Sequence, residues 1–165
     1  MENFADLLAA NETYAANFTK EDLTGFAKKG LAIVTCMDSR IDPLNIVGMH
    51  AGDAKILRNA GARVTDDVLR TLVLATFLLG VNRVLVMPHT DCRMASATEP
   101  EIHQEIMREY LVDTRSVEIR TVKDQVEALR YDVTRIRTFP LLARGVIVAG
   151  GIYDVHSGKL QPLAV

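Results

Sequence analysis

The fold is decided by the stretch Leu31-Ala32-Ile33-Val34-Thr35-Cys36-Met37-Asp38-Ser39-Arg40. Its first half is a short apolar run that follows Gly30, contains β-branched residues and is typical of a buried strand. Its second half is polar and begins with a cysteine. In open α/β sheets, functional sites gather beyond the carboxyl ends of the strands, so this stretch predicts a strand that delivers a site at its end.

Beyond this stretch, apolar segments of strand length alternate with segments of helix length. This alternation predicts an α/β domain whose central, largely parallel sheet is flanked by helices. After the last core strand, Gly150-Gly151 predicts a turn, and Ser157-Gly158 predicts the tip of a hairpin that adds a C-terminal antiparallel edge strand. We expect strands at 31–35, 54–57, 83–87 and 145–149, helices at 66–79, 101–111 and 122–137, and one or two helices within 4–26.

The length of 165 residues favours a single domain, which we expect to span residues 1–165. Its first part, to about residue 28, predicts a helical arm in which Thr19-Lys20-Glu21-Asp22 resembles a helix start. The helix from Val68 to Leu79 is apolar nearly all round and must be buried on most faces. It is either a central core helix or a helix partly buried against a second copy of the chain, and isologous dimers are the commonest soluble oligomers.

The composition narrows the range of partners. Hydrophobic residues make up 48% of the chain and charged residues 24%, which is typical of a globular protein. The formal net charge of -2 argues against a nucleic-acid partner, which would need a basic surface. No apolar run reaches the roughly 18 residues of a membrane span, and the acidic start Met1-Glu2-Asn3-Phe4-Ala5-Asp6 does not resemble a secretory signal. We therefore expect no membrane partner and a cytoplasmic location in which thiols stay reduced.

Cys36, His89 and Cys92 are candidate ligands of a zinc ion. In a reducing compartment, two such cysteines more readily bind metal or react than form a disulfide, although two inert buried thiols are the alternative. Cys36 follows one predicted strand, and the other two residues follow another, so a parallel sheet would bring all three to the same edge. Two thiolates and an imidazole suit zinc, and three protein ligands leave one position open for chemistry.

Asp38 and Arg40 lie beside the first candidate ligand and can serve that open position. The guanidinium can clamp the carboxylate through its fork of donors, which keeps the carboxylate ionised. The alternative is an ordinary surface ion pair, which contributes little to stability.

Three motifs within residues 31–94 carry a family resemblance: Val34-Thr35-Cys36-Met37-Asp38-Ser39-Arg40, Arg58-Asn59-Ala60-Gly61 and His89-Thr90-Asp91-Cys92. With them the chain resembles the β-class carbonic anhydrases, in particular their compact bacterial branch. The resemblance implies a parallel α/β sheet with helical arms that works as a homodimer or a multiple of dimers. It implies one Zn²⁺ per chain held by Cys36, His89 and Cys92, a catalytic dyad of Asp38 and Arg40, and a substrate pocket lined by Asn59, Ala60 and Gly61.

The family reversibly hydrates carbon dioxide to bicarbonate and a proton, so the resemblance implies a carbonic anhydrase, that is, a carbonate dehydratase and zinc lyase. Zinc lowers the pKa of its bound water, and the resulting hydroxide attacks the carbon. Asp38 would orient this hydroxide, and Arg40 would keep the carboxylate off the metal. Two alternatives stay open: hydrolysis of CS2 or COS by the same ligands, and a structural or regulatory zinc protein in which Asp38 closes the site as fourth ligand.

Some residues stand outside this scheme. Gly61 can serve simply as a turn residue with positive φ. Where the family usually has glycine after the second cysteine, this chain has Arg93. If that position requires a positive φ, arginine is strained there by roughly 1–2 kcal/mol; otherwise its side chain can narrow the substrate path, attract bicarbonate or compete with Arg40 for Asp38. We expect the remaining histidines to be surface or packed residues: His50, His103 and His156.

Overall fold

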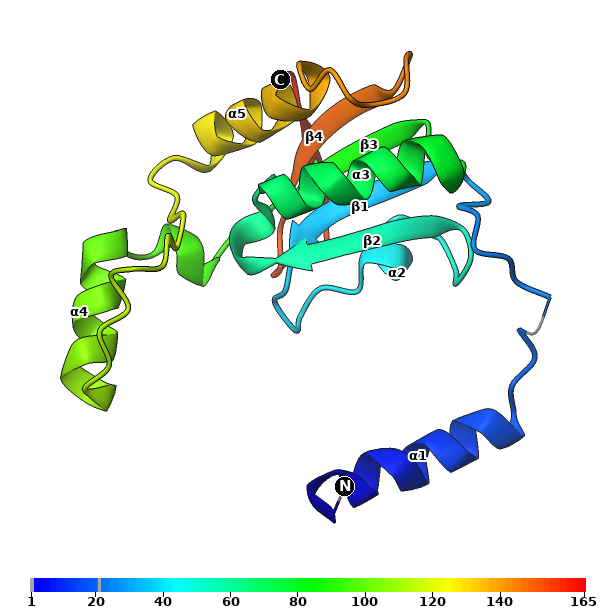
Figure 1. Ribbon diagram of the computed structural model, residues 1–165, viewed down its shortest axis with the longest axis horizontal. Helices are drawn as coiled ribbons and strands as arrows, with labels where there is room; N and C mark the ends of the chain where they lie inside the picture. Colours follow the sequence, from blue (N-terminus) through cyan, green and yellow to red (C-terminus); the bar gives the residue numbers. More distant parts are fainter. Residues whose placement is uncertain (1, 21) are drawn as a thin grey trace.

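Five strands form one sheet in the order β2-β1-β3-β4-β5 (Figure 1) in the computed structural model, which describes residues 2–20 and 22–165. The first four strands are parallel, and β5 runs antiparallel to β4. This arrangement confirms the predicted α/β fold with its antiparallel C-terminal edge strand. The strands are β1 (Leu31–Cys36), β2 (Ala54–Asn59), β3 (Arg83–Met87), β4 (Ile147–Tyr153) and β5 (Leu160–Leu163).

The strand β1 is the centre of the sheet, and all six of its residues are buried. It pairs with β2 so that Cys36 faces Asn59, and with β3 so that Thr35 faces Met87. The hydroxyl of Thr35 donates to the carbonyl of Met87 at 2.7 Å, which satisfies a buried polar side chain at the end of the strand. The carboxyl ends of three neighbouring strands therefore lie at one edge.

Two apolar clusters cover the two faces of the sheet, because successive side chains of a strand point to opposite sides. Ala32 and Val34 of β1 belong to the larger cluster, with residues of α3 (Asp66–Leu78) and α5 (Gln125–Arg137). Ile33 of β1 belongs to the smaller cluster, which also contains both cysteines. The candidate metal ligands are thus part of a hydrophobic core.

The helices α1 (Ala5–Ala16) and α4 (Glu99–Tyr110) extend away from the sheet (Figure 1). None of the described residues of α1 is buried. Among the described residues, no helix combines the length and apolar character that a membrane span requires. The remaining elements are the short helix α2 (Pro43–Ile46), which the sequence did not predict, and three 3-10 turns, η1 (Glu2–Phe4), η2 (Ala60–Ala62) and η3 (Arg93–Ala95).

The N-terminal helix is shorter than predicted. It ends at Ala16, and the described residues 17–20 and 22–30 contain turns and bends but no second helix. Asn17 ends α1 because its side-chain amide donates to the carbonyl of Thr13 at 2.8 Å, which satisfies a carbonyl of the last turn. Glu21, part of the predicted helix start, lies outside the described residues.

The Gly150-Gly151 pair is also placed differently from the prediction, because it continues β4 and does not form a turn. A Cβ on Gly150 would lie 3.0 Å from the side chain of Leu129 on α5, and one on Gly151 would lie 3.0 Å from the carbonyl of Gln161. The glycines therefore let α5 and β5 approach the strand closely. The hairpin turn around Ser157-Gly158 is confirmed, between β4 and β5.

Candidate metal centre

The fold brings Cys36, His89 and Cys92 together at the carboxyl edge of the sheet. Cys36 is the last residue of β1, and the other two follow β3. One ligand atom from each residue lies within 4.8 Å of the others, and all three residues are buried. The two Sγ atoms are 4.0 Å apart, close to the roughly 3.8 Å between two sulfurs bound tetrahedrally to one zinc at ~2.3 Å.

The imidazole of His89 is oriented for metal binding. Its Nδ1 lies 2.8 Å from the carbonyl of Thr90 and donates to it, which leaves Nε2 with the free lone pair. Nε2 is buried and has no hydrogen-bond partner among the described residues. Buried polar atoms are rarely left without a partner, so a metal ion at this position fits the residues present. The amide of Gln125 donates to the His89 carbonyl at 2.7 Å and fixes its backbone.

The two cysteine sulfurs interact, and the interaction shifts their pKa values in opposite directions. A hydrogen bond from Cys92 holds the pKa of Cys36 well below its usual range against the opposing effect of burial, with further help from His89 and the Gly61 amide. The same interaction raises the pKa of Cys92, which acts as the donor. Burial disfavours the imidazolium of His89, but the Cys36 thiolate outweighs it and raises the pKa of His89. The lowered pKa favours the thiolate form of Cys36, which is the form that binds a metal cation.

The carboxylate of Asp38 lies beside this cluster and is clamped by Arg40. Nε of Arg40 donates to Oδ1 at 2.9 Å, and Nη2 donates to Oδ2 at 2.7 Å. These bonds hold the pKa of Asp38 well below its usual range, so the carboxylate is an ionised acceptor at neutral pH. Its Oδ2 lies 3.9 Å from Nε2 of His89, at the edge of the cluster.

Two more residues fix this pair. Arg58 of β2 donates from Nε to the carbonyl of Cys36 at 2.9 Å and from Nη2 to that of Asp38 at 2.6 Å. Asp91 accepts from Nη1 of Arg40 at 2.8 Å. The sequence motifs contained both residues, but nothing in their spacing indicated these contacts.

The predicted pocket residues 59–61 form a tight turn after β2. The amide of Asn59 donates to the carbonyl of Arg63 at 2.6 Å and accepts from its backbone nitrogen at 2.8 Å, so this side chain is used within the turn. Ala60 begins η2, and Gly61 has a φ of 81°. The backbone N–H of Gly61 donates to Sγ of Cys36 at 3.4 Å, which contributes to the stabilisation of its thiolate.

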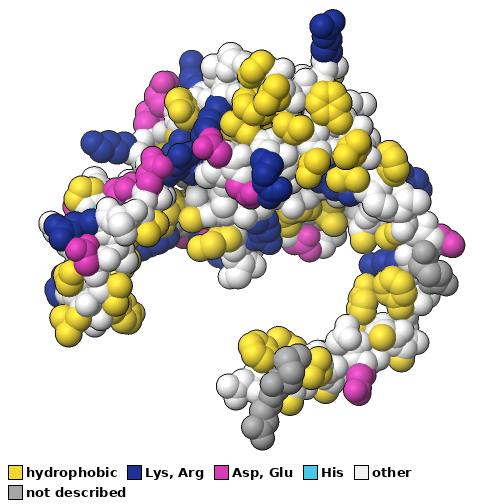
Figure 2. Space-filling view, in the orientation of Figure 1, with side chains coloured by type: hydrophobic (Ala, Val, Ile, Leu, Met, Phe, Trp, Pro, Cys, Tyr) yellow, Lys and Arg dark blue, Asp and Glu magenta, His cyan; other side chains and the backbone are white. Residues whose placement is uncertain are grey.

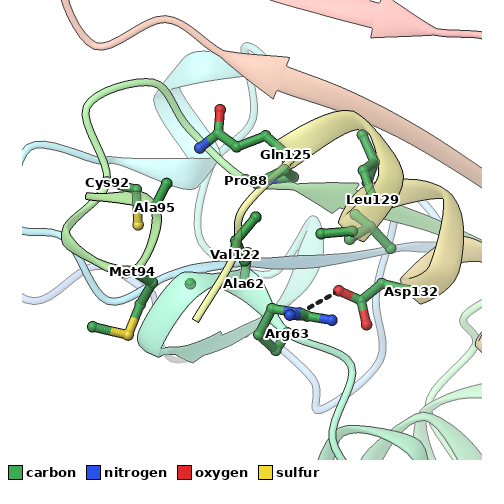
Figure 3. A pocket seen from close by; sticks show the side chains of 13 residues that line it. Ala62, Arg63, Pro88, Cys92, Met94, Ala95, Val122, Gln125, Leu129 and Asp132 are labelled. Atoms are coloured by element: carbon green, nitrogen blue, oxygen red, sulfur yellow. Dashed lines mark hydrogen bonds and ion pairs between the residues drawn. The ribbon is translucent and has the colours of Figure 1, made fainter. Parts of the chain in front are cut away.

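A small cavity lies behind Cys92, between η2 and α5 (Figure 3). Its free space of about 10 Å³ is room for about one water molecule. Across it, Nε of Arg63 donates to Oδ2 of Asp132 at 2.7 Å, and Oδ1 accepts from the backbone of Val64 at 3.2 Å. This buried pair ties the turn to α5. No sequence motif indicated this pair, because its partners are 69 positions apart.

Arg93 does not have the strained backbone considered for it. Between His89 and Cys92 the left-handed residue is Asp91, with a φ of 54°, and Arg93 is absent from the described residues with positive φ. The guanidinium of Arg93 pairs with Glu105 of α4, away from Asp38. His103 and His156 contribute no ligand to the cluster of described residues. His103 hydrogen-bonds Thr114, and the exposed His156 has its Nε2 4.0 Å from Oδ2 of Asp91.

The fold and the site define an α/β protein with a buried Cys-His-Cys cluster that could hold a metal ion and still leave one position open. Comparison with known proteins makes this class specific. A family model described as carbonic anhydrase matches residues 31–160. The chain belongs to the β-carbonic anhydrase family, which confirms the predicted family and enzyme class.

Individual relatives agree with this assignment. The β-carbonic anhydrase 1 of Mycobacterium tuberculosis is 38% identical over 157 residues, or 94% of each chain. The crystal structure of a carbonic anhydrase from Streptococcus mutans matches with a TM-score of 0.90 and 37% identity, and 98% of each chain is covered. A carbon disulfide hydrolase from Acidithiobacillus thiooxidans is 26% identical. The match spans 83% of this chain and 74% of that protein.

Proposed function

We propose that this chain is a zinc enzyme that reversibly hydrates carbon dioxide to bicarbonate and a proton. The observation that carries the proposal is the buried, unpartnered Nε2 of His89, grouped with two cysteine sulfurs and with the clamped carboxylate of Asp38. The name and the 38% identity of the mycobacterial relative support carbon dioxide as the substrate.

Cys36, His89 and Cys92 would hold the zinc ion. When bound, zinc supplies a Lewis acid that lowers the pKa of water enough to provide hydroxide near neutral pH. Two thiolates donate more charge than imidazoles, so the Gly61 N–H that bonds the Cys36 sulfur helps to moderate this donation.

Asp38 would orient the nucleophile, because its ionised carboxylate can only accept a hydrogen bond and so selects a hydroxyl group that donates to it. Arg40 would hold the carboxylate in place, since both of its forked bonds go to Asp38. Together the two residues keep a lone pair of the nucleophile aimed at the substrate carbon. The proton released in the hydration must leave to solvent or buffer.

A stopped-flow assay of CO2 hydration with a pH indicator, run beside metal analysis, tests the proposal. We expect zinc at about one per chain and hydration that depends on the zinc. Removal of zinc by a chelator should abolish hydration, and added zinc should restore it. Zinc-loaded protein that hydrates no CO2 between neutral and alkaline pH would contradict the proposal.

A second candidate is hydrolysis of CS2 or COS, which the name of the relative from Acidithiobacillus thiooxidans favours. The two candidates share the same ligands, so a direct assay separates them. Release of hydrogen sulfide from CS2 without CO2 hydration would favour the second. A third candidate, a closed structural or regulatory zinc protein, requires Asp38 on the metal, whereas the bonds from Arg40 support an Asp38 held beside it.

We also propose that the chain forms a dimer or a multiple of dimers. Leu74, Phe77 and Leu78 of α3 are exposed by 46%, 60% and 62%, and apolar side chains gather on this face in Figure 2. An apolar helix face of this kind is typical of a subunit interface. Phe77→Glu should lower the molar mass measured by light scattering, whereas Glu127→Gln on the exposed side of α5 should not.

We propose a cytoplasmic location as well, because the two free cysteines must stay reduced to bind a metal ion.

A further inference from the structure

Arg40 has a second carboxylate partner in Asp91. Nη1 of Arg40 donates to Oδ2 of Asp91 at 2.8 Å, and Nη2 donates to the backbone carbonyl of Asp91 at 3.0 Å. With the bonds from Nε and Nη2 to Asp38, every nitrogen of the guanidinium has an acceptor. The guanidinium is therefore fixed between two residues, one on each side, and cannot swing freely about Asp38.

The backbone of Asp91 is shaped for this contact. Its φ of 54° lies in the left-handed region, which aspartate and asparagine tolerate better than most residues other than glycine. Asp91 stands between the candidate ligands His89 and Cys92, so the contact ties Arg40 to the ligand loop. Its side chain is 62% exposed, and among the described residues the other nitrogen within 4.0 Å of its carboxylate is Nε2 of His156.

The orientation of Arg40 matters because Asp38 is already close to the metal position. Oδ2 of Asp38 lies 3.9 Å from Nε2 of His89, an atom that would bind the metal. Two atoms bound tetrahedrally to one zinc at ~2.0–2.1 Å lie roughly 3.4 Å apart. A small displacement would therefore bring the carboxylate onto the open position, and the bonds from Arg40 oppose it.

We propose that Asp91 is a positioning residue, which holds Arg40 in the orientation that keeps the Asp38 carboxylate beside the open metal position and off it. Asp91 acts only through Arg40 and contacts neither substrate nor metal. The inference rests on the proposed function, because it concerns the same open position of the same site.

Anion binding to the cobalt-substituted protein tests this role without relying on catalysis. Co²⁺ replaces zinc, and a thiocyanate titration followed by the visible spectrum of the metal reports how available the open position is. Asp91→Gly keeps the left-handed backbone and removes the carboxylate, so Asp38 should occupy the open position more often. We expect thiocyanate to bind roughly fivefold more weakly, in line with the loss of one exposed ion pair.

Two further variants grade this effect. Asp91→Asn keeps an acceptor oxygen but loses the charge, so its effect should be smaller than that of Asp91→Gly. Asp113→Asn removes a carboxylate from a similar pair away from the site and should leave thiocyanate binding unchanged. Because Asp91→Asn preserves the size and the backbone preference of the residue, it remains informative if the glycine variant fails to fold.

A double-mutant cycle separates positioning from a merely structural effect. In an Asp38→Asn background no carboxylate can compete for the metal, so Asp91→Gly should change thiocyanate affinity by less than about twofold. An equal loss of affinity in both backgrounds would overturn the inference, as would unchanged or tighter binding by Asp91→Gly alone.

The same measurements keep the inference distinct from the proposed function. If the wild-type protein hydrates CO2 while Asp91→Gly binds thiocyanate like the wild type, the inference fails and the function stands. If the wild type hydrates no CO2 while the cycle behaves as expected, the function fails and the positioning role stands. A wild-type protein that binds neither zinc nor cobalt would overturn both.

Discussion

Asp38 and Arg40 form the same clamp as Asp113 and Arg115 elsewhere in the molecule. In both pairs the arginine donates from Nε to Oδ1 at 2.9 Å and from Nη2 to Oδ2 at 2.7 Å. The backbone N–H of each arginine also bonds Oδ1, at 2.9 and 3.1 Å. Two residues separated by one position therefore produce this geometry locally, whatever surrounds them.

The surroundings make the difference. Arg115 bonds only Asp113 among the described residues, and its side chain is 78% exposed. Arg40 is held by Asp91 as well, and Asp38 lies beside buried sulfur and nitrogen atoms. The Asp38–Arg40 pair thus has an ordinary geometry. What distinguishes it is its position after β1, which places the carboxylate beside the candidate metal ligands.

The largest effect should come from removing one of the candidate metal ligands beside the Asp38–Arg40 pair. Cys92→Ala takes away one of three candidate ligands, and structural zinc sites lose affinity steeply when a ligand is missing. We expect zinc to fall from about one per chain to nearly none, with hydration at the background rate. Atomic absorption after gel filtration measures the metal, and Arg115→Gln, purified alongside, should keep its zinc. Stoichiometric zinc in Cys92→Ala would mean that the ligand set is wrong.

The next effect separates the two clamps directly. Asp38→Asn should lower kcat by about a hundredfold or more, as expected when the group that orients the nucleophile is lost, while zinc stays bound. Asp113→Asn should hydrate CO2 like the wild type. Stopped-flow assays of the two variants at equal zinc content make the comparison. Equal rates for both variants would show that the first clamp is only a surface ion pair.

The parts of this site that follow from local sequence were predictable. Cys36 ends β1, and His89 and Cys92 follow the end of β3. The register of β1 with β2 and β3 brings the strand ends together, as the alternation of strands and helices implied. The Asp38–Arg40 clamp needs only two nearby residues.

The rest depends on contacts between distant segments, which one sequence does not reveal. Gln125 reaches His89 across 36 positions, and Arg63 reaches Asp132 across 69. The Gly150-Gly151 pair shows the same limit in the fold: glycine pairs usually indicate turns, but these glycines make room for Leu129 and for β5. A glycine pair is compatible with a turn or with a strand that its neighbours approach closely, and here tertiary packing favours the strand.

A third arginine–carboxylate pair sharpens the contrast between exposed and buried clamps. Asp132 and Arg63 have side chains exposed by only 4% and 14%. Asp132→Asn leaves a buried guanidinium without its counter-charge, so we expect the free energy of unfolding to fall by about 2–3 kcal/mol. Urea denaturation measures the change, and Glu127→Gln, on the exposed side of the same helix, should have little effect. No loss of stability in Asp132→Asn would mean that water enters the cavity and solvates the guanidinium of Arg63 in place of the carboxylate.

The smallest effect should be on stability at the exposed clamp. Arg115 holds the pKa of Asp113 well below its usual range, first through side-chain hydrogen bonds. Because the folded-state pKa is depressed, the carboxylate stabilises the fold above its unfolded pKa near 4 and loses this contribution as the pH falls through the depressed value.

The urea midpoint of Asp113→Asn should therefore lie slightly below that of the wild type at pH 7, and the two should converge in acid. Both side chains of this clamp are largely exposed to screening by water, so the difference at pH 7 should be small. A large difference would mean that the clamp is a stabilising element by itself. The Asp38–Arg40 pair would then be explained by stability alone, whereas a small difference leaves its place beside the cysteines as the reason for its geometry.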